Sequence, residues 1–300
     1  MNAISGDVLI GDATGSDVLL LGDTAGSDYT YDGIIRNGAA GLMAITKAGT
    51  GTLTLANTAV VATTSYTGAT TINDGRLVLS NMTVFNSPVT INNNGTLLLS
   101  NMGGFGGSIT INSTAAEALT FNQTSRNLTT AALISGTGAL TVNAGAYTLT
   151  LTGGNAGYGG LITLNSGTLG IGNNAALGFG PITINGGILR ASGAARVLSN
   201  LVTVNGSFTL GRLTDFNNVV TLGANVTITA DNPDGPANNN SRFNGGIQGP
   251  FEITFAEGTH LLGTGAIVIA GISTNSGGTV VQSAACSWRR RVRWPMHRSR

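Results

Sequence analysis

The sequence predicts an all-β fold, a right-handed parallel β-helix (solenoid) with coils of about 20 residues. Three observations lead to this class: a recurring Thr-aliphatic-Asn motif, an abundance of glycine, and a scarcity of charge. Glycine accounts for 46 of the 300 residues, charged residues for 9% and hydrophobic residues for 41%. Disordered chains combine low hydrophobicity with high charge, so this composition indicates ordered short strands separated by turns.

The motif reads Thr, an aliphatic residue, Asn and then a glycine-containing turn. Its aliphatic position holds Ile72, Ile91, Ile111, Val142, Leu164, Ile184 and Val204. Subtracting successive residue numbers gives intervals of 19, 20, 31, 22, 20 and 20. A unit of this length holds two or three short strands, which stack about 4.8 Å above those of the preceding unit. The one long interval predicts an insertion or one and a half degenerate coils.

Alternation within each unit predicts which side chains enter the core. Thr71, Arg76 and Val78 are expected to face outward or to flank the strands. Val204 is followed by Phe208 and Leu210 one residue out of phase, which predicts a shifted turn there. The residues expected inside are, coil by coil, Ile72, Leu77 and Leu79, then Ile91, Leu97 and Leu99, then Leu164, Leu169 and Ile171.

Asparagine and glycine take fixed places after the aliphatic position. Asn tolerates the left-handed backbone that a sharp corner needs, and stacked Asn amides can form a hydrogen-bonded ladder. Polar ligands for an ion are the alternative, but no carboxylates recur beside them. The asparagines are Asn73, Asn92, Asn112, Asn143, Asn165, Asn185 and Asn205. The glycines expected to supply positive φ are Gly75, Gly95, Gly145, Gly167 and Gly187.

Composition divides the chain into five segments. Residues 1–44 are expected to form N-terminal β coils able to cap the stack, and residues 45–230 the repeats. Residues 231–250 hold three of the six prolines and are predicted to be a loop or break, followed by further β coils over 251–282. The basic tail, 283–300, holds both tryptophans and Cys286, the single cysteine. A misread terminus is favoured over a nucleic-acid or membrane patch there.

Charge and hydropathy exclude several classes of function. The tail contains six of the 14 basic residues, which leaves 8 basic against 13 acidic residues elsewhere. This acidic body gives no electrostatic reason to bind nucleic acid. No run approaches the roughly 18 apolar residues of a membrane span, so none is expected. The stretch from Met1 to Gly15 lacks the basic start and apolar core of a signal peptide.

The stretch from Ile45 to Asn81 resembles the autotransporter-associated β-strand repeat of passenger-type proteins. A weaker echo runs from Gly153 to Ile171 and includes Tyr158, Gly159 and Gly160. The residues that match the first half of the family pattern are Lys47, Gly49, Gly51, Thr52, Leu53, Thr54 and Leu55. Those that match the second half are Tyr66, Thr67, Gly68, Thr70, Ile72, Gly75 and Leu77.

This resemblance implies a β-helical passenger that is secreted or held at the cell surface. Association with the outer membrane would come through a region missing from this sequence, so we expect a piece of a longer protein. The predicted function is an extracellular structural or adhesive scaffold that is not an enzyme. No catalytic, cofactor-binding or metal-binding residues are assigned. Expected partners are surface glycans or proteins, with self-association through the solenoid ends as a further possibility.

A carbohydrate-active β-helix enzyme, a polysaccharide lyase or hydrolase, is the alternative function. Such enzymes need clustered carboxylates, often with basic neighbours. Neither the Glu117 and Arg126 pair nor the Asp215 and Arg212 pair lines up with acids one coil away. His260 lies near Glu257 and could form an acid–base pair with it, but a lone surface histidine is favoured; His297 is the only other histidine.

The N-terminal stretch raises the question of calcium. Its aspartates recur every five or six residues with glycines between them, at Asp7, Asp12, Asp17, Asp23 and Asp28. Calcium-binding β-rolls require a Gly-Gly-x-Gly-x-Asp motif with a period of about nine residues, which is missing here. Short strands at Val8–Ile10 and Val18–Leu21, joined by polar turns, are therefore favoured over a calcium site.

Overall fold

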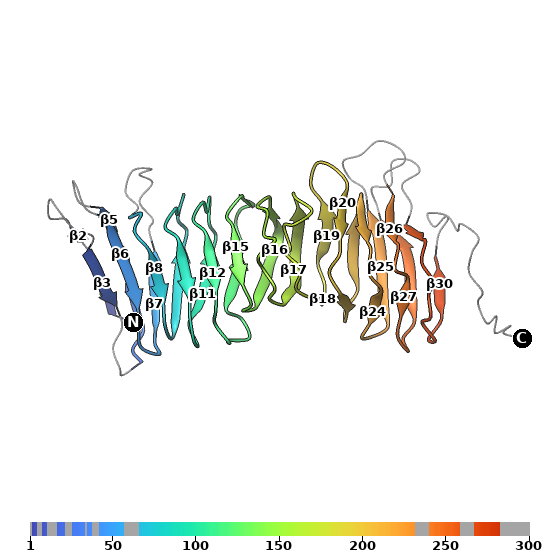
Figure 1. The fold of residues 1–300 in the computed structure, drawn as a ribbon, viewed down its shortest axis with the longest axis horizontal. Coiled ribbons are helices and arrows are strands. Elements are labelled where there is room, and N and C mark those ends of the chain that lie inside the picture. The colour runs from blue at the N-terminus through green and yellow to red at the C-terminus, as the bar shows by residue number, and fades with distance from the viewer. Residues whose placement is uncertain are drawn as a thin grey trace, which may run out of the picture. The chain divides into compact units, whose positions relative to one another are not determined.

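The computed structural model describes residues 2–4, 8–10, 17–21, 26–33, 35–37, 42–56, 66–231, 240–258 and 267–282 (Figure 1). Its regular elements are β-strands, which pair in parallel from one coil to the next. The predicted all-β parallel β-helix is therefore confirmed. The chain divides into two compact units, Met1–Ile182 and Thr183–Arg300.

The first unit contains two long parallel sheets and a small one. The small sheet pairs β2 (Val8–Ile10) with β5 (Ile35–Asn37). One long sheet contains β3 (Asp17–Leu21), β6 (Met43–Lys47), β8 (Thr70–Ile72), β10 (Val89–Ile91), β12 (Ile109–Ile111) and β15 (Ile134–Gly136). The other contains β1 (Asn2–Ile4), β4 (Tyr29–Tyr31), β7 (Thr52–Ala56), β9 (Arg76–Ser80), β11 (Thr96–Ser100), β13 (Leu119–Asn122), β14 (Leu128–Thr130), β16 (Leu140–Leu151) and β17 (Ile162–Ile171).

The core follows the predicted alternation. All nine residues expected inside are at most 1% exposed, and they form apolar columns because equivalent residues pair in register. Leu77 pairs with Leu97, and Leu79 with Leu99. Arg76 is exposed, and Thr71 and Val78 are half-buried. Period-two alternation thus determines the register, because a slip of one residue would expose every apolar side chain.

The long interval in the motif marks a change of sheet. Thr110 of β12 pairs with Ser135 of β15, 25 residues later, and Ile111 pairs with Gly136 in the same register. Val142 lies six residues beyond Gly136, in the other long sheet, where it pairs with Phe121 of β13. The interval is therefore one coil, from Ile111 to Gly136, plus a short step to Val142, rather than one and a half coils.

Glycines occupy the corners for two different reasons. Gly75, Gly145, Gly167 and Gly187 have φ between +57° and +79°, as predicted. Gly95 does not, because Asn93 (φ 49°) takes the left-handed position in that turn. A Cβ at Gly95 would lie 2.7 Å from the carbonyl oxygen of Ile72, so close approach of the preceding coil requires glycine there.

The second unit repeats the same stacking in three columns of strands. The first column is β19 (Ile188–Ala191), β22 (Phe208–Gly211), β25 (Val226–Asp231), β28 (Ile253–Glu257) and β30 (Thr279–Val281). The second is β21 (Val202–Val204), β24 (Val220–Leu222) and β27 (Ile247–Gln248). The third is β20 (Arg196–Leu198), β23 (Thr214–Phe216), β26 (Ser241–Phe243) and β29 (Ile267–Ile269). The strand β18 (Ile182–Ile184) spans the boundary between the units in sequence.

The turn after Val204 is shifted, as the sequence predicted. Leu210 lies over Leu189 in the paired strands β19 and β22. The turn from Val204 to Leu210 is therefore one residue longer than the turn from Ile184 to Leu189. Within the segment expected to be a loop, 231–250, β26 and β27 continue the stacking, while residues 232–239 lie outside the described residues. The tail 283–300, with Cys286, also lies outside them.

Candidate functional site

The only lysine of the chain, Lys47, is buried in the repeat motif. It is 1% exposed and holds the inward position that Ile72 holds one coil later. Its Nζ donates to the carbonyl oxygens of Ala48 at 2.8 Å, Gly49 at 2.7 Å and Asp74 at 3.4 Å. These carbonyls offset the cost of burying the ammonium group. Lys47 thereby joins the turn after β6 to the turn after β8.

Gly75 completes the turn around this ammonium group. Its φ is +64°, a left-handed conformation that glycine adopts without strain. A Cβ at this position would lie 2.8 Å from Nζ of Lys47 and 2.4 Å from the carbonyl oxygen of Gly49. The lysine and the glycines of the motif are therefore parts of one packed corner.

The second half of the motif builds a buried chain of hydroxyl groups. The hydroxyl of Tyr66 is 2.8 Å from Oγ1 of Thr70, which is 2.7 Å from Oγ of Ser87 in the next coil. Ser87 donates to the carbonyl oxygen of Gly68 at 2.6 Å. Burial raises the pKa of Tyr66. The ring of Tyr66 meets Phe85 edge-on at 5.5 Å, so this tyrosine links two coils through both its ring and its hydroxyl.

The motif asparagines form the predicted amide ladders, one coil to the next. None of them has positive φ; the left-handed non-glycine residues among those described are Asn81, Asn93, Asn101 and Leu213. The predicted backbone reason is therefore wrong; after five of the seven asparagines a left-handed residue follows one or two positions later, Asn93 in one turn and glycine in the other four. The Nδ2 to Oδ1 distances are 3.1 Å for Asn92 to Asn73, 3.2 Å for Asn112 to Asn92, 3.0 Å for Asn165 to Asn143 and 3.3 Å for Asn205 to Asn185.

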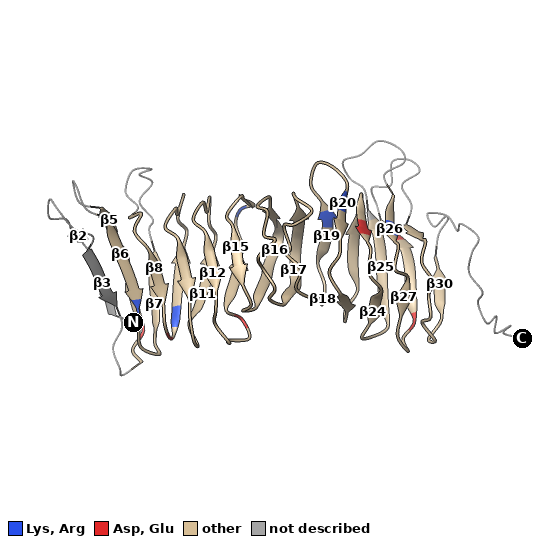
Figure 2. Cartoon of the chain, in the orientation of Figure 1, with Lys and Arg blue, Asp and Glu red and all other residues tan. Residues whose placement is uncertain are grey.

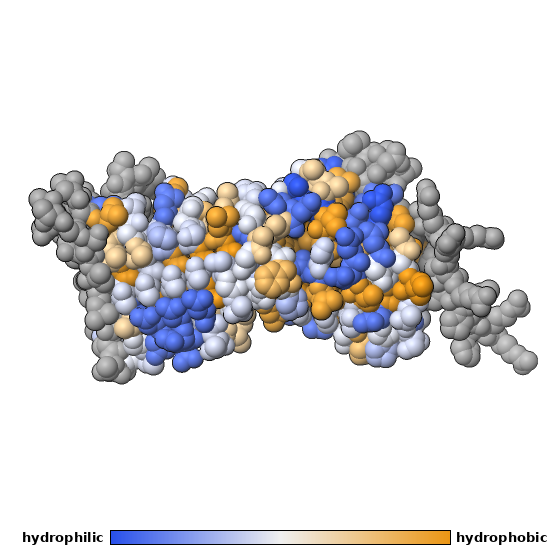
Figure 3. Space-filling model, viewed as in Figure 1, coloured by the Kyte–Doolittle hydropathy of each residue, from blue (hydrophilic) through white to orange (hydrophobic). Residues whose placement is uncertain are grey.

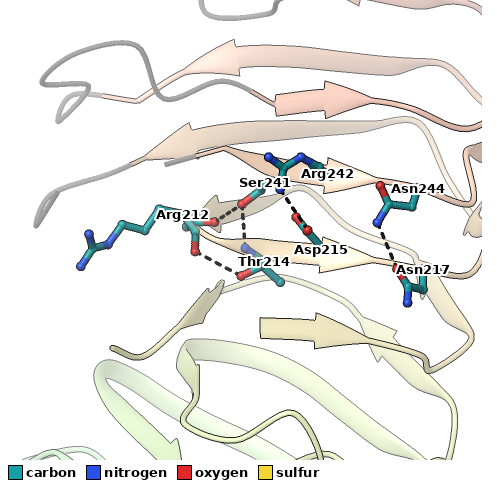
Figure 4. Close-up of polar contacts among 8 residues, drawn as sticks. Arg212, Thr214, Asp215, Asn217, Ser241, Arg242 and Asn244 are labelled. Carbon is teal, nitrogen blue, oxygen red and sulfur yellow. Dashed lines mark hydrogen bonds and ion pairs between the residues drawn. The ribbon is translucent and has the colours of Figure 1, made fainter. Parts of the chain in front are cut away.

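The outer side of β23 and β26 carries an ion pair (Figure 4). Asp215 Oδ2 accepts from Nη1 of Arg242 at 3.2 Å, and the two residues pair in register from adjacent coils. Arg212, which sequence reasoning placed beside Asp215, points away from it (Figure 4). A further amide contact, Asn244 Nδ2 to Asn217 Oδ1 at 3.0 Å, runs alongside. Asp215 therefore serves to join two coils, as the asparagines do.

The other candidate acids do not gather into a site within the described residues. Arg126 extends toward Gly103, where a Cβ would lie 3.2 Å from its Nη1. Asp28 is exposed, and its Oδ1 accepts from the amide of Thr52 at 2.6 Å, which lowers the pKa of this carboxyl group. Asp7, Asp12, Asp23, His260 and His297 lie outside the described residues, as does the side chain of Asp17. No group of three or more potential metal ligands occurs in the part of the chain described.

One polar side chain inside the first unit does lack partners. Gln123 is 0% exposed, and neither its Oε1 nor its Nε2 has a hydrogen-bond partner among the residues that the structure describes. A buried polar group left without a partner costs about 1 to 3 kcal/mol. It follows β13 at a position that sequence alternation alone did not single out.

Replacing Gln123 by methionine is expected to stabilise the first unit. Methionine has similar length and carries no group that needs a hydrogen bond, so the free energy of unfolding should rise by about 1 to 2 kcal/mol. Urea denaturation of the two proteins measures the change. The control is Gln248→Met, because Gln248 is exposed and bonded to Thr221 at 2.9 Å. A loss of stability in Gln123→Met would contradict the argument.

Comparison with known proteins gives the family of the repeat. Residues 45–79 match the family model of the passenger-associated-transport-repeat. The chain carries a passenger-type repeat. This repeat and the β-solenoid fit an autotransporter passenger-type repeat protein. Neither the curated proteins nor the solved structures gave a match.

The passenger-type repeat uses its motif residues for stacking. Lys47, Tyr66 and Gly75 all lie within the matched range, and each contacts a neighbouring coil. Sequence reasoning matched these residues to the family pattern but gave them no roles. Lys47 is the single lysine of a chain with few charges, and this rarity could have indicated that it has a specific structural role. Among the described residues, no helix has the length and apolarity to cross a membrane.

Proposed function

We propose that the chain is a passenger-like scaffold, secreted or presented at the cell surface, that binds other surfaces and catalyses no reaction. The observation that carries this proposal is that the polar groups of the motif are engaged by the neighbouring coils. Lys47 and the motif asparagines bond across coils, and Tyr66 bonds to Thr70, which in turn bonds to Ser87 of the next coil. A side chain already held in this way supports the stack rather than a reaction.

The surface of the first unit suits adhesion to neutral partners. On the face drawn in Figure 3, its residues are mostly of intermediate hydropathy. Thr71, Thr90 and Thr110 lie in register on the outer side of β8, β10 and β12. Such rows offer hydroxyl groups at a regular spacing to glycans or proteins.

The test is binding of the full chain to a panel of glycans, with turnover of the same glycans assayed in parallel. Saturable binding without cleavage is the expected result. Cleavage that Glu257→Gln abolishes would replace this proposal by a carbohydrate-active enzyme. If neither binding nor cleavage occurs, the adhesive part of the proposal is wrong for glycans, and binding to immobilised surface proteins decides whether it holds for proteins.

The second unit is expected to self-associate through β30. This strand pairs with β28 on one side and is the last described strand of its sheet, and Val280 and Val281 are each 39% exposed. Among the described residues no strand pairs with its other edge, and an unpaired strand edge invites pairing with another chain. Sedimentation should therefore give a mass that rises with concentration, and Val281→Lys should weaken the rise. The control is Val84→Lys at an exposed turn, and a monomer at all concentrations would contradict the prediction.

A further inference from the structure

An exposed aromatic ring stands on a turn of the first unit. Phe179 is 69% exposed, the highest exposure among the large apolar side chains described in this unit. Its amide donates to the carbonyl oxygen of Tyr158 at 2.9 Å, which ties its backbone to the preceding coil. The ring has no aromatic partner among the described residues. The ring is thus presented outward by an ordered backbone.

The glycines on either side let this turn lie against the preceding coil. Gly178 has φ +60°, and a Cβ there would lie 2.0 Å from the carbonyl oxygen of Tyr158. A Cβ at Gly180 would lie 2.0 Å from the carbonyl oxygen of Gly160. Both positions therefore exclude any side chain. The Gly-Phe-Gly turn sits directly on the coil beneath it, with the phenylalanine as its only side chain.

The ring leans over a third glycine. A Cβ at Gly159 would lie 2.6 Å from Cζ of Phe179. In successive coils, Thr137, Gly159 and Phe179 hold equivalent places, because Gly138, Gly160 and Gly180 stack on one another. Thr137 is exposed, and its hydroxyl makes no hydrogen bond among the described residues. The column therefore presents an apolar ring with a free hydroxyl group two coils away.

Charge is missing from this part of the sequence. The segment 127–189 contains no Asp, Glu, Lys or Arg. β16 and β17 accordingly carry neither blue nor red in Figure 2. A charged ligand would find no counter-charge here, whereas a neutral ligand loses no ionic hydration on binding.

The size of the apolar surface argues against a protein partner. A stable protein interface buries about 800 Å² on each side, whereas one aromatic ring supplies about 150 to 250 Å². Leu161, 39% exposed, and the exposed Pro181 add little. A surface of this size matches one sugar ring.

We propose that Phe179 is a stacking platform for a pyranose ring of a neutral glycan, with Thr137, two coils away, as a hydrogen-bonding group for a neighbouring sugar of the same glycan. The C–H groups on the apolar face of a sugar carry partial positive charge and meet the negative face of the aromatic ring. Hydroxyl groups at the rim of the sugar reach the polar groups beside it. This inference rests on the proposed adhesive function and names the ligand class and the residue.

The test is affinity electrophoresis of the full chain in gels that contain dextran, mannan, galactan or, as the acidic comparison, alginate. At least one neutral polysaccharide should retard the wild-type chain and alginate should not. Phe179→Ala should weaken the retardation about tenfold in Kd, and Phe179→Trp should retain it. Leu133→Ala is the matched control. Leu133 is 57% exposed and directly precedes β15, so its replacement should not change the retardation.

The outcomes separate the two proposals. If the wild-type chain binds a neutral polysaccharide and Phe179→Ala binds it equally well, this inference is wrong and the adhesive function stands. Retardation by alginate alone overturns the neutral ligand class. If no polysaccharide binds, both this inference and glycan adhesion are wrong. Equal thermal unfolding of the Phe179 variants and the wild-type chain confirms that the fold is intact.

Discussion

Replacing Phe243 by alanine is expected to destabilise the second unit by about 4 kcal/mol. Phe243 is 0% exposed, stacks on Phe216 at 4.9 Å and meets Phe255 edge-on at 6.3 Å. Truncation removes both ring contacts and leaves a cavity between coils that the strand spacing prevents from closing. Hydrogen exchange of the backbone amides of β23, β26 and β28 measures the loss locally.

The matched control for this change is Phe179→Ala in the same chain. Because Phe179 is largely exposed, its truncation should alter stability by no more than about 0.5 kcal/mol. Exchange in the first unit should stay unchanged in Phe243→Ala, since coils interact only with their neighbours. Equal protection of β26 in the wild-type chain and in Phe243→Ala would contradict the prediction.

Replacing Lys47 by methionine is expected to destabilise the coils around β6 and β8 by about 3 kcal/mol. Methionine fits the volume of the lysine stem but leaves the carbonyl oxygens of Ala48, Gly49 and Asp74 without their donor. Hydrogen bonds to a charged group are stronger than neutral ones, so this loss exceeds that of an ordinary surface contact. Urea denaturation, followed by exchange of the β8 amides, measures it.

Arg76→Met serves as the control, because Arg76 is an exposed cation on β9. Its removal should change stability by no more than about 0.5 kcal/mol. As Lys47 is the sole lysine, acylation by an amine-reactive reagent gives a second readout. Modification of Lys47 in the folded chain as fast as in urea would show that the ammonium group is not held in place.

The fold could be predicted from the sequence because it follows from two local features, the alternation of apolar residues along each strand and the nearly constant length of the repeat. The inward places of Leu77, Leu97 and Leu169 needed only period-two alternation, and the ladder of Asn73, Asn92 and Asn112 needed only their common place in the repeat. The left-handed corner could not be assigned in the same way. Backbone φ depends on where each turn meets the coil below. In the turn after β10, the left-handed residue is Asn93 and not the predicted Gly95.

Contacts between coils of unequal length were beyond sequence reasoning. Asp215 was considered with Arg212, which is close in sequence, but its partner is Arg242 in the next coil. A neighbouring column of the second unit repeats over a shorter interval, from Val202 to Val220, so no single period gives these partners. Phe179 was missed for a related reason, because its exposure follows from three stacked glycines in different coils.

The parallel pairing has a consequence for the kinetics of folding. Paired residues lie one coil apart along the chain, for example Val202 and Val220 or Asp215 and Arg242. The loops closed in these two cases differ in length, 18 against 27 residues, but the entropic cost of closure grows only with the logarithm of loop length, so it is almost the same for every coil. Relative contact order falls as coils are added, in contrast to sheets that join distant strands. Adding coils therefore lengthens the solenoid without slowing the step in which each coil forms.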